Sequence, residues 1–175
     1  MKNIVLTGYM ASGKTTVGEE LKKITGKELV DTDKLIEEEA GMTVNEIFQR
    51  FGEEYFRDLE KIAVCIASSY SGIIVSTGGG AVLNEENRKR LRDTGVVFNL
   101  TMTDDLIRER IDMAKDTRPL MADDVENIIK RYHDRENFYN DCDFKINTVG
   151  KTPTDIAAEI LKNYILKTMI LKEDK

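Results

Sequence analysis

Short apolar runs alternate with longer amphipathic stretches along this chain. The runs at residues 3–7, 28–31, 73–76, 96–100 and 144–146 predict five β-strands. Because these runs are almost uninterruptedly apolar, we expect strands that are buried on both faces, as in a parallel sheet covered by helices. Strands that alternate with helices in this way are typical of an α/β fold.

The amphipathic stretches between the runs predict helices. We expect helices at residues 15–24, 85–92, 104–114, 125–140 and 154–167. Thr43, with Glu46 three residues later, forms a capping box and marks the start of another helix, with a further helical segment after it. The apolar positions expected to face the core from these helices are Val17, Leu21, Ile24, Ile47, Phe48, Phe51, Tyr55, Leu59, Ile62, Ile66, Ile156, Ile160, Leu161 and Ile165.

One polar stretch interrupts the pattern. Residues 115–124, with Arg118-Pro119 in the middle, lie between two predicted helices and belong to neither. The stretch is a candidate lid over a binding site, and otherwise a surface loop. The 175 residues contain no repeat and no linker, so we expect a single domain over 1–175 with a lid at about residues 112–124.

Charge and composition narrow the classes of partner. The 32 acidic and 26 basic residues leave a net charge of −6, which argues against a nucleic-acid partner. The first apolar run is too short for a signal peptide and no stretch approaches a membrane span, so we expect a cytoplasmic protein. No long apolar stripe is left over for an interface, so we expect a monomer. Cys65 and Cys142 form no metal-binding pattern, and we expect two reduced, partly buried thiols.

The clearest chemical signal is the octapeptide after the first predicted strand. It matches G-x-x-x-x-G-K-[ST] at every fixed position and opens the first predicted helix, as a phosphate-binding loop does. Glycines turn backbone N–H groups toward phosphate oxygens, and the positive end of the helix points to the same place. We expect Lys14 to reach the β and γ phosphates and Thr15 to offer its hydroxyl to Mg²⁺. The expected nucleotide-binding residues here are Gly8, Ala11, Ser12, Gly13, Lys14, Thr15 and Thr16.

Candidate residues for a second, acceptor site follow later strands. The GTPase motifs D-x-x-G and N-K-x-D do not occur, which favours a small-molecule kinase that needs an acid near the acceptor hydroxyl. Asp31 and Asp33 follow the second predicted strand, at the sheet edge where ligands bind. One carboxylate could hold hydrated Mg²⁺ and the other could accept the hydroxyl proton, or Asp33 could simply be an N-cap. The glycines 78–80 indicate either a close backbone approach to a ligand or a tight turn.

Three arginines are candidate anion ligands. Arg57 precedes Glu60 by three residues, a helical spacing at which the acid can orient the guanidinium. Arg118 lies in the candidate lid, where closure could bring its charge onto the transferring phosphoryl group. By spacing alone, a solvated helix face is the simpler interpretation of Arg57, Arg135 and the lone His133.

Taken in order, these motifs resemble those of shikimate kinase, from residue 2 to about residue 158. After the phosphate loop come an Asp-x-Asp pair, a Phe-Arg-x-x-Glu segment and a Thr-Gly-Gly-Gly turn, a set specific to that family among small P-loop kinases. The matching positions are 8–15, 31–33, 56–60, 76–82, 117–120, Arg135 with Tyr139, and 152–153.

The resemblance implies a nucleoside-monophosphate-kinase-like P-loop fold, with a five-stranded parallel sheet flanked by helices and a lid. It implies transfer of the γ-phosphoryl group of MgATP to the 3-hydroxyl of shikimate, a step of aromatic amino-acid biosynthesis. By position, Lys14, Asp33 and Arg118 would be catalytic, with Asp33 as the base. Arg110, or else Arg108, would flank the adenine with Pro153. The shikimate ligands would be Asp33, Arg57, Gly78, Gly79, Gly80 and Arg135, and the magnesium ligands Thr15 and Asp31.

One departure and two alternatives accompany this interpretation. Ala11 stands where the family usually has glycine, and we expect the methyl group to be tolerated because the position need not adopt a positive φ. A gluconate-type kinase shares the fold and also takes a carboxylated polyol, but the Thr-Gly-Gly-Gly and Phe-Arg-x-x-Glu motifs favour shikimate. A catalytically silent ATP-binding regulator is the alternative from another class, and the filled catalytic positions argue against it.

Overall fold

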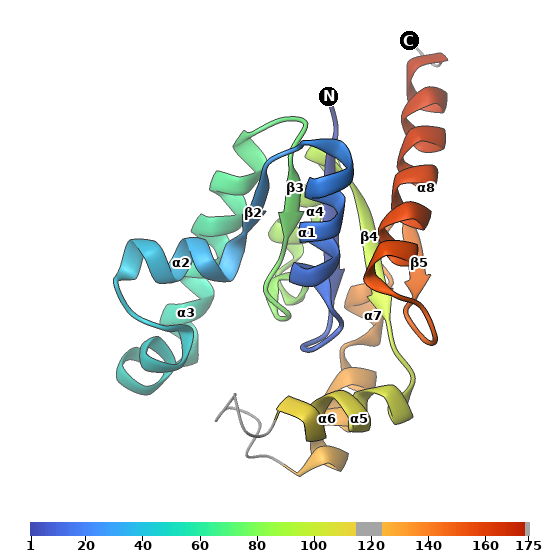
Figure 1. Ribbon diagram of the computed structural model, residues 1–175. Coiled ribbons are helices and arrows are strands. Elements are labelled where there is room, and N and C mark those ends of the chain that lie inside the picture. Colours follow the sequence, from blue (N-terminus) through green and yellow to red (C-terminus); the bar gives the residue numbers. More distant parts are fainter. Residues whose placement is uncertain (115–123, 174–175) are drawn as a thin grey trace.

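The computed structural model describes residues 1–114 and 124–173, which form a parallel sheet between two layers of helices (Figure 1). The five strands pair in the order β2-β3-β1-β4-β5. They are β1 (Asn3–Gly8), β2 (Leu29–Asp31), β3 (Ile74–Ser76), β4 (Gly95–Thr101) and β5 (Phe144–Asn147). All five predicted strands are confirmed, with each end within one residue of its predicted position.

The helices connect the strands and cover both faces of the sheet. They are α1 (Lys14–Thr25), α2 (Thr32–Ala40), α3 (Val44–Ser69), α4 (Glu85–Thr94), α5 (Asp104–Ala114), α6 (Val125–Asp134), α7 (Glu136–Tyr139) and α8 (Pro153–Glu173), with a short 3₁₀ helix at Ala81–Leu83. Helices α2 and α3 project to one side of the carboxyl edge of the sheet, and α5 and α6 lie below that edge (Figure 1). The candidate site lies at this edge.

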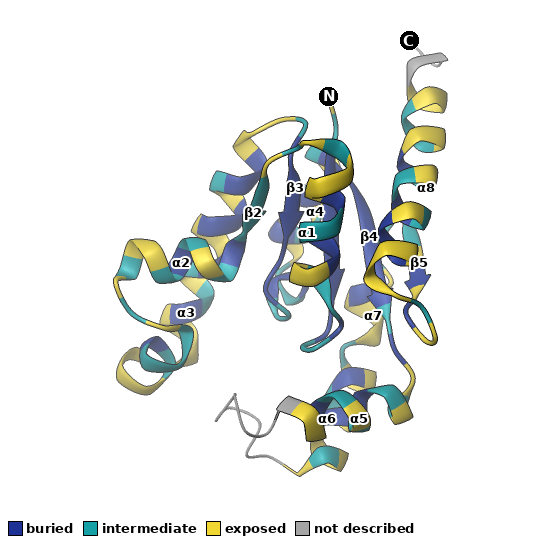
Figure 2. Ribbon diagram, in the orientation of Figure 1, coloured by how far each residue is buried: buried dark blue, intermediate teal, exposed yellow. Residues whose placement is uncertain are grey.

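Alternation along the strands divides the core into two main clusters. Leu6 and Phe98 pack against α1 and α8, whereas Val5 and Val97 face α3 and α4 on the other side of the sheet. Each fully buried aliphatic side chain contributes roughly 1.5–3 kcal/mol relative to its exposed state. The sheet is accordingly the most buried part of the molecule (Figure 2). The two edge strands are less buried, since β2 is only partly buried throughout and β5 exposes Lys145 and Asn147.

Helix α3 confirms one prediction and corrects another. The capping box is present, since the Glu46 N–H donates to Thr43 Oγ1 at 3.3 Å and the Thr43 N–H donates to Glu46 Oε2 at 2.8 Å. The core-facing positions predicted after it were only half correct, because Leu59 and Ile66 are partly buried but Tyr55 and Ile62 are 46% and 56% exposed. Gly52, with φ 81° and ψ 176°, interrupts the helix. This kink turns the second half, so that a different face, with Phe56, Glu60, Ala63, Val64 and Ala67, is buried.

Two later helices also differ from the prediction. The single helix expected at 125–140 is divided into α6 and α7 at Arg135, whose backbone has φ −98° and ψ −3°. Helix α8 continues six residues beyond the predicted end at residue 167. Its final turns expose an apolar stripe, formed by Ile165, Leu166, Met169 and Ile170. The reason given for a monomer was therefore wrong, and the oligomeric state stays a prediction.

The predicted burial of two helix residues and of the cysteines was only partly confirmed. Ile24 and Phe51, predicted to face the core, are 47% and 50% exposed. Both cysteines are free thiols, but Cys65 is exposed and only Cys142 is partly buried. Among the described residues, no helix combines the length and apolar character needed to cross a membrane.

The expectation about Ala11 was also wrong. Its φ is 59°, and among the residues that the structure describes it is the only non-glycine with a positive φ. The loop from β1 to α1 turns so tightly that this position lies in the left-handed region, where a Cβ is unfavourable by roughly 1–2 kcal/mol. Alanine is thus accommodated under strain at this position.

We predict that Ala11→Gly stabilises the free protein by about 1 kcal/mol, because glycine removes the strain but also gives the unfolded chain more freedom. Urea unfolding followed by circular dichroism measures this change. Ala67→Gly, inside the second half of α3, is the matched control and should destabilise the protein by about 1 kcal/mol or more. A destabilised Ala11→Gly protein would contradict the strain.

Candidate active site

The phosphate loop connects β1 to α1 at the carboxyl edge of the sheet. The Ser12 N–H donates to Tyr9 O at 3.2 Å, and Gly13 adopts φ 93° at the N-cap of α1 without a side-chain cap. The first N–H groups of α1 therefore have no capping side chain and point toward the loop, as anion binding requires. Lys14 Nζ donates to Gly8 O at 2.8 Å and to Tyr9 O at 2.9 Å, which holds the ammonium group across the loop.

Asp31 connects this loop to two neighbouring segments. Its Oδ2 accepts from Thr15 Oγ1 at 2.9 Å and from Ser76 Oγ at 3.0 Å. Its Oδ1 accepts from the backbone N–H groups of Asp33 and Lys34 and so caps α2. The N-cap is therefore Asp31, and the alternative in which Asp33 is the cap was wrong. The link through Ser76 was missed, although this residue directly precedes the Thr-Gly-Gly-Gly turn.

The carboxyl group of Asp33 has the properties of a base. Burial, together with the charge of Asp31, raises its pKa to about 6, while the ammonium of Lys14 acts in the opposite direction. Its Oδ1 is buried and has no hydrogen-bond partner in the part of the chain that the structure describes. A buried carboxylate oxygen without a donor is costly, so a group that enters the site and donates a proton to it would be favoured.

Each glycine of the turn after β3 faces a different neighbour. A Cβ on Gly78 would collide with Asp33, and a Cβ on Gly80 would collide with the guanidinium of Arg57. A Cβ on Gly79 would lie 3.3 Å from Met10 N in the phosphate loop. The Gly78 N–H donates to Thr32 Oγ1 at 2.8 Å, and Tyr139 Oη donates to Gly79 O at 2.5 Å. Protein neighbours thus account for all three glycines, which bring the turn against the base, the phosphate loop and the arginine.

Arg57 is held by two glutamates. Its Nη1 donates to Glu60 at 2.9 Å and its Nη2 donates to Glu53 at 2.9 Å. The predicted pairing with Glu60 is confirmed, and Glu53 was missed although it lies four residues before Arg57, a spacing at which helical side chains meet. Glu60 is 1% exposed, and its Oε1 has no hydrogen-bond partner within the described residues.

Arg135 reaches the same region from the junction of α6 and α7. Burial raises the pKa of Glu60, and the positive charges of Arg57 and Arg135 act in the opposite direction. Burial likewise raises the pKa of Tyr139, again against the charge of Arg135. The charge of Arg135 therefore acts on both groups, while the Asp33 carboxyl and the Arg57 guanidinium contact the glycine turn itself.

A cavity of about 240 Å³ lies beside the phosphate loop, between α1, α5 and α8. Arg110 Nη1 donates to Ala11 O at 2.8 Å, whereas Arg108 pairs with Glu126 at 2.8 Å on another side of α5. Of the two arginines considered for the adenine, Arg110 is thus the one beside the loop. Most residues that line this cavity were predicted to bind the nucleotide, but Val17, Lys151 and Ile156 were missed. The lining residues are Ala11, Ser12, Gly13, Thr16, Val17, Arg110, Lys151, Pro153 and Ile156. Arg118 lies outside the described residues.

The known proteins that are most similar to this chain in sequence are shikimate kinases. The family model described as "Shikimate kinase" matches residues 10–165. A shikimate kinase of Caldanaerobacter subterraneus subsp. tengcongensis is 46% identical over 94% of this chain and 97% of its own length. A solved shikimate kinase from Acinetobacter baumannii, in complex with shikimate, superposes with a TM-score of 0.87 at 32% identity and covers 96% of this chain and 94% of its own.

A gluconokinase from Sinorhizobium meliloti 1021 is a more distant match, with a TM-score of 0.62 and 16% identity. It covers 99% of this chain and 97% of its own, and at this identity the match shows only a shared fold. The predicted P-loop, nucleoside-monophosphate-kinase-like fold is confirmed by the solved shikimate kinases. A match over most of the chain, with relatives above 40% identity across nearly all of it, shows that this chain belongs to the shikimate kinase family and is an ATP-dependent kinase.

Proposed function

We propose that the carboxyl edge of the sheet transfers the γ-phosphoryl group of ATP to the 3-hydroxyl of shikimate. Family membership supports the reaction class. The observation that carries the acceptor assignment is the group of side chains around residues 78–80. There a buried carboxyl with an unpartnered oxygen, Asp33, lies beside the glycine turn that Arg57 contacts, with Arg135 close by.

The proposed acceptor chemistry follows from these groups. Two guanidinium groups suit one carboxylate, which each can grip with parallel hydrogen bonds. The backbone of Gly79 and Gly80 is only partly buried and can approach the ring closely. Asp33 would accept a hydrogen bond from the attacking hydroxyl and then its proton, while Lys14 stabilises the charge on the transferring group. Arg118 would add a second cation when the lid closes.

We further propose that Mg²⁺ binds where Thr15 and Asp31 meet. Their 2.9 Å hydrogen bond places a hydroxyl and a carboxylate together at the mouth of the phosphate loop. The described residues contain no cluster of three or more His, Cys, Asp or Glu side chains. This fits Mg²⁺, which usually keeps several waters and binds through one or two protein oxygens plus phosphate oxygens. The ion would bridge and neutralise the phosphates.

We also propose how the chain is organised and where it works. The chain would act as one P-loop kinase domain over 1–175, with its lid at about residues 112–124 and the adenine between Arg110 and Pro153. It would work in the cytoplasm as a monomer. The exposed stripe on α8 makes sedimentation velocity the measurement that tests the monomer.

A coupled ADP-release assay with MgATP tests the reaction. We expect turnover with shikimate, and at least about a hundredfold less with gluconate or without acceptor, because only a carboxylated ring places its hydroxyl at Asp33. Turnover with gluconate at the shikimate rate would contradict the acceptor assignment. Binding of ATP without turnover on any acceptor would instead support a silent regulator.

We predict opposite effects of Asp33→Asn on activity and on stability. The variant should lose at least about a hundredfold in kcat and retain its ATP affinity, because the amide cannot accept the proton. In the wild type, kcat/KM for shikimate should rise with pH through about 6, the pKa of Asp33, because only the ionised carboxyl is a base. An unchanged kcat in the variant would exclude Asp33 as the base.

The stability of the same variant has a defined pH dependence. Because the folded protein raises the pKa of Asp33 to about 6, the charged form disfavours folding above that pH. The penalty disappears as the pH falls through the unfolded value of about 4. Asp33→Asn should therefore stabilise the free protein by about 1–3 kcal/mol at alkaline pH, and this gain should vanish near pH 4. An equal gain at both pH values would exclude the ionised carboxyl as its cause.

We predict that Arg57→Ala raises the KM for shikimate at least about tenfold and leaves the KM for ATP within about twofold, because only the acceptor loses a charge-assisted hydrogen bond. Arg50→Ala is the matched control, since Arg50 is an exposed arginine in the first half of the same helix. It should change neither constant. Equal weakening of both substrates by Arg57→Ala would contradict a carboxylate site at this residue.

A further inference from the structure

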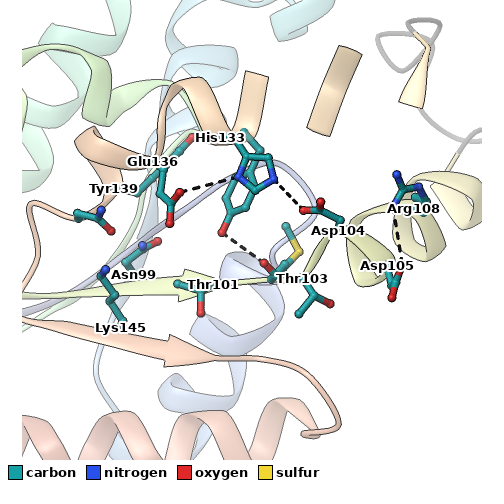
Figure 3. A pocket seen from close by; sticks show the side chains of 13 residues that line it. Asn99, Thr101, Thr103, Asp104, Asp105, Arg108, His133, Glu136, Tyr139 and Lys145 are labelled. Carbon is teal, nitrogen blue, oxygen red and sulfur yellow. Dashed lines mark hydrogen bonds and ion pairs between the residues drawn. The ribbon is translucent and has the colours of Figure 1, made fainter. Parts of the chain in front are cut away.

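A second cavity, of about 690 Å³, lies on the other face of the sheet from the adenine cavity (Figure 3). It lies between the carboxyl halves of β4 and β5, the start of α5, and the α6–α7 segment. Asn99 and Lys145 are paired in the β4–β5 register, so their side chains project from the same face of the sheet. Val97, two residues before Asn99, packs with α3 and α4, which places this face opposite α1 and α8.

Asn99 points to a ligand in this cavity. Its side chain is only 4% exposed and lines the cavity. Within the described residues, no side-chain hydrogen bond of Asn99 occurs, so a primary amide with two donors and an acceptor is left for whatever enters. Neither polar atom of Asn99 is among the fully buried unpartnered atoms of the described residues, so the amide reaches the interior of the cavity, where a polar ligand group can replace water.

The walls carry charges of both signs. Lys145 lies beside Asn99 and forms no ion pair with a described residue. On the helical side, His133 Nε2 lies 2.9 Å from Asp104 and its Nδ1 lies 3.8 Å from Glu136. Figure 3 shows Asn99 and Lys145 at one end, Glu136 and His133 along the side, and Asp104 farther along. Met102 and Tyr132 also line the cavity, and each is less than one-tenth exposed.

We propose that this cavity binds a small zwitterion. Its carboxylate would be held by Lys145 and the Asn99 amide, and its ammonium group by Glu136 and Asp104, with an apolar part over Met102 and Tyr132. A simple anion would meet the carboxylates of Glu136 and Asp104, and a simple cation would meet Lys145. Only a molecule that joins both charges satisfies both ends of the cavity.

The cavity is physically connected to the proposed acceptor site. Tyr139 lines the cavity, and its hydroxyl holds Gly79 O at 2.5 Å. Arg135 lies between two lining residues, His133 and Glu136, on the segment that separates the cavity from the glycine turn. A ligand that draws Glu136 inward would move this segment, so occupancy of the cavity would alter the apparent affinity for the acceptor.

Isothermal titration of the full chain, saturated with MgADP and shikimate, tests the site with L-phenylalanine as probe. This probe joins both charges to an apolar group. We expect it to bind, and 3-phenylpropanoate and phenethylamine, which each lack one charge, to bind at least about tenfold more weakly. No binding up to about 10 mM, or equal binding of all three compounds, would overturn the proposal.

Two variants locate the probe. Asn99→Leu and Lys145→Met should each weaken its binding at least about tenfold, since each removes hydrogen bonds to a carboxylate. Lys145 is exposed, so its variant should fold, and Lys89→Met on α4, which also removes an exposed lysine, is the matched control. Unchanged affinity in both variants, or displacement of the probe from the free enzyme by shikimate, would overturn the assignment.

Steady-state kinetics test the connection between the two sites. The probe should change the KM for shikimate at least about twofold in the wild type and should not change it in Lys145→Met. Unchanged kinetics of the wild type at saturating probe would overturn the connection to the acceptor site.

Discussion

The carboxylate of Asp31 fixes the position of the phosphate loop relative to α2, the helix that carries Asp33. Asp31 accepts from Thr15 at the start of α1, from Ser76 at the end of β3, and from the first backbone N–H groups of α2. These segments come from three different parts of the chain, and each carries a proposed function. Because Asp31 uses both oxygens, the start of α2 is tied to the start of α1 and to the end of β3. The second residue of α2 is Asp33, whose Oδ1 is buried and has no hydrogen-bond partner among the described residues.

The glycine turn shows how close packing and chemistry coincide. A Cβ would collide with Asp33 at Gly78 and with Arg57 at Gly80, and at Gly79 it would lie in tight contact with the backbone of the phosphate loop. The proposed base, the phosphate loop and the proposed carboxylate-binding arginine therefore all lie against one short segment. Tyr139 supports that segment from behind through its hydrogen bond to Gly79. A kinase needs its donor and acceptor sites aligned within a few tenths of an ångström, and contacts of this kind provide such alignment.

The two cavities use opposite faces of one sheet. Alternation along β4 sends Phe98 and Leu100 toward α1 and α8, on the side of the cavity beside the phosphate loop, and sends Asn99 toward the other side. The α6–α7 segment then separates the second cavity from the glycine turn, with Arg135 at its break. A fold that places catalysis at the carboxyl edge thus leaves a polar cavity one helical layer away. The proposed zwitterion site follows from that geometry.

The local features of this protein could be predicted from its amino-acid sequence. The strands, the phosphate loop and the capping box of α3 depend on short-range periodicity and spacing, and all were predicted correctly. Other features depended on contacts between distant segments. The left-handed backbone of Ala11, the buried face of α3 after Gly52 and the break at Arg135 were decided by packing. The role of Asp31 as cap and the reason for each glycine likewise required the neighbours that the fold supplies. Periodicity reports only how one element can present its residues, whereas tertiary structure decides which neighbour occupies the space beside them.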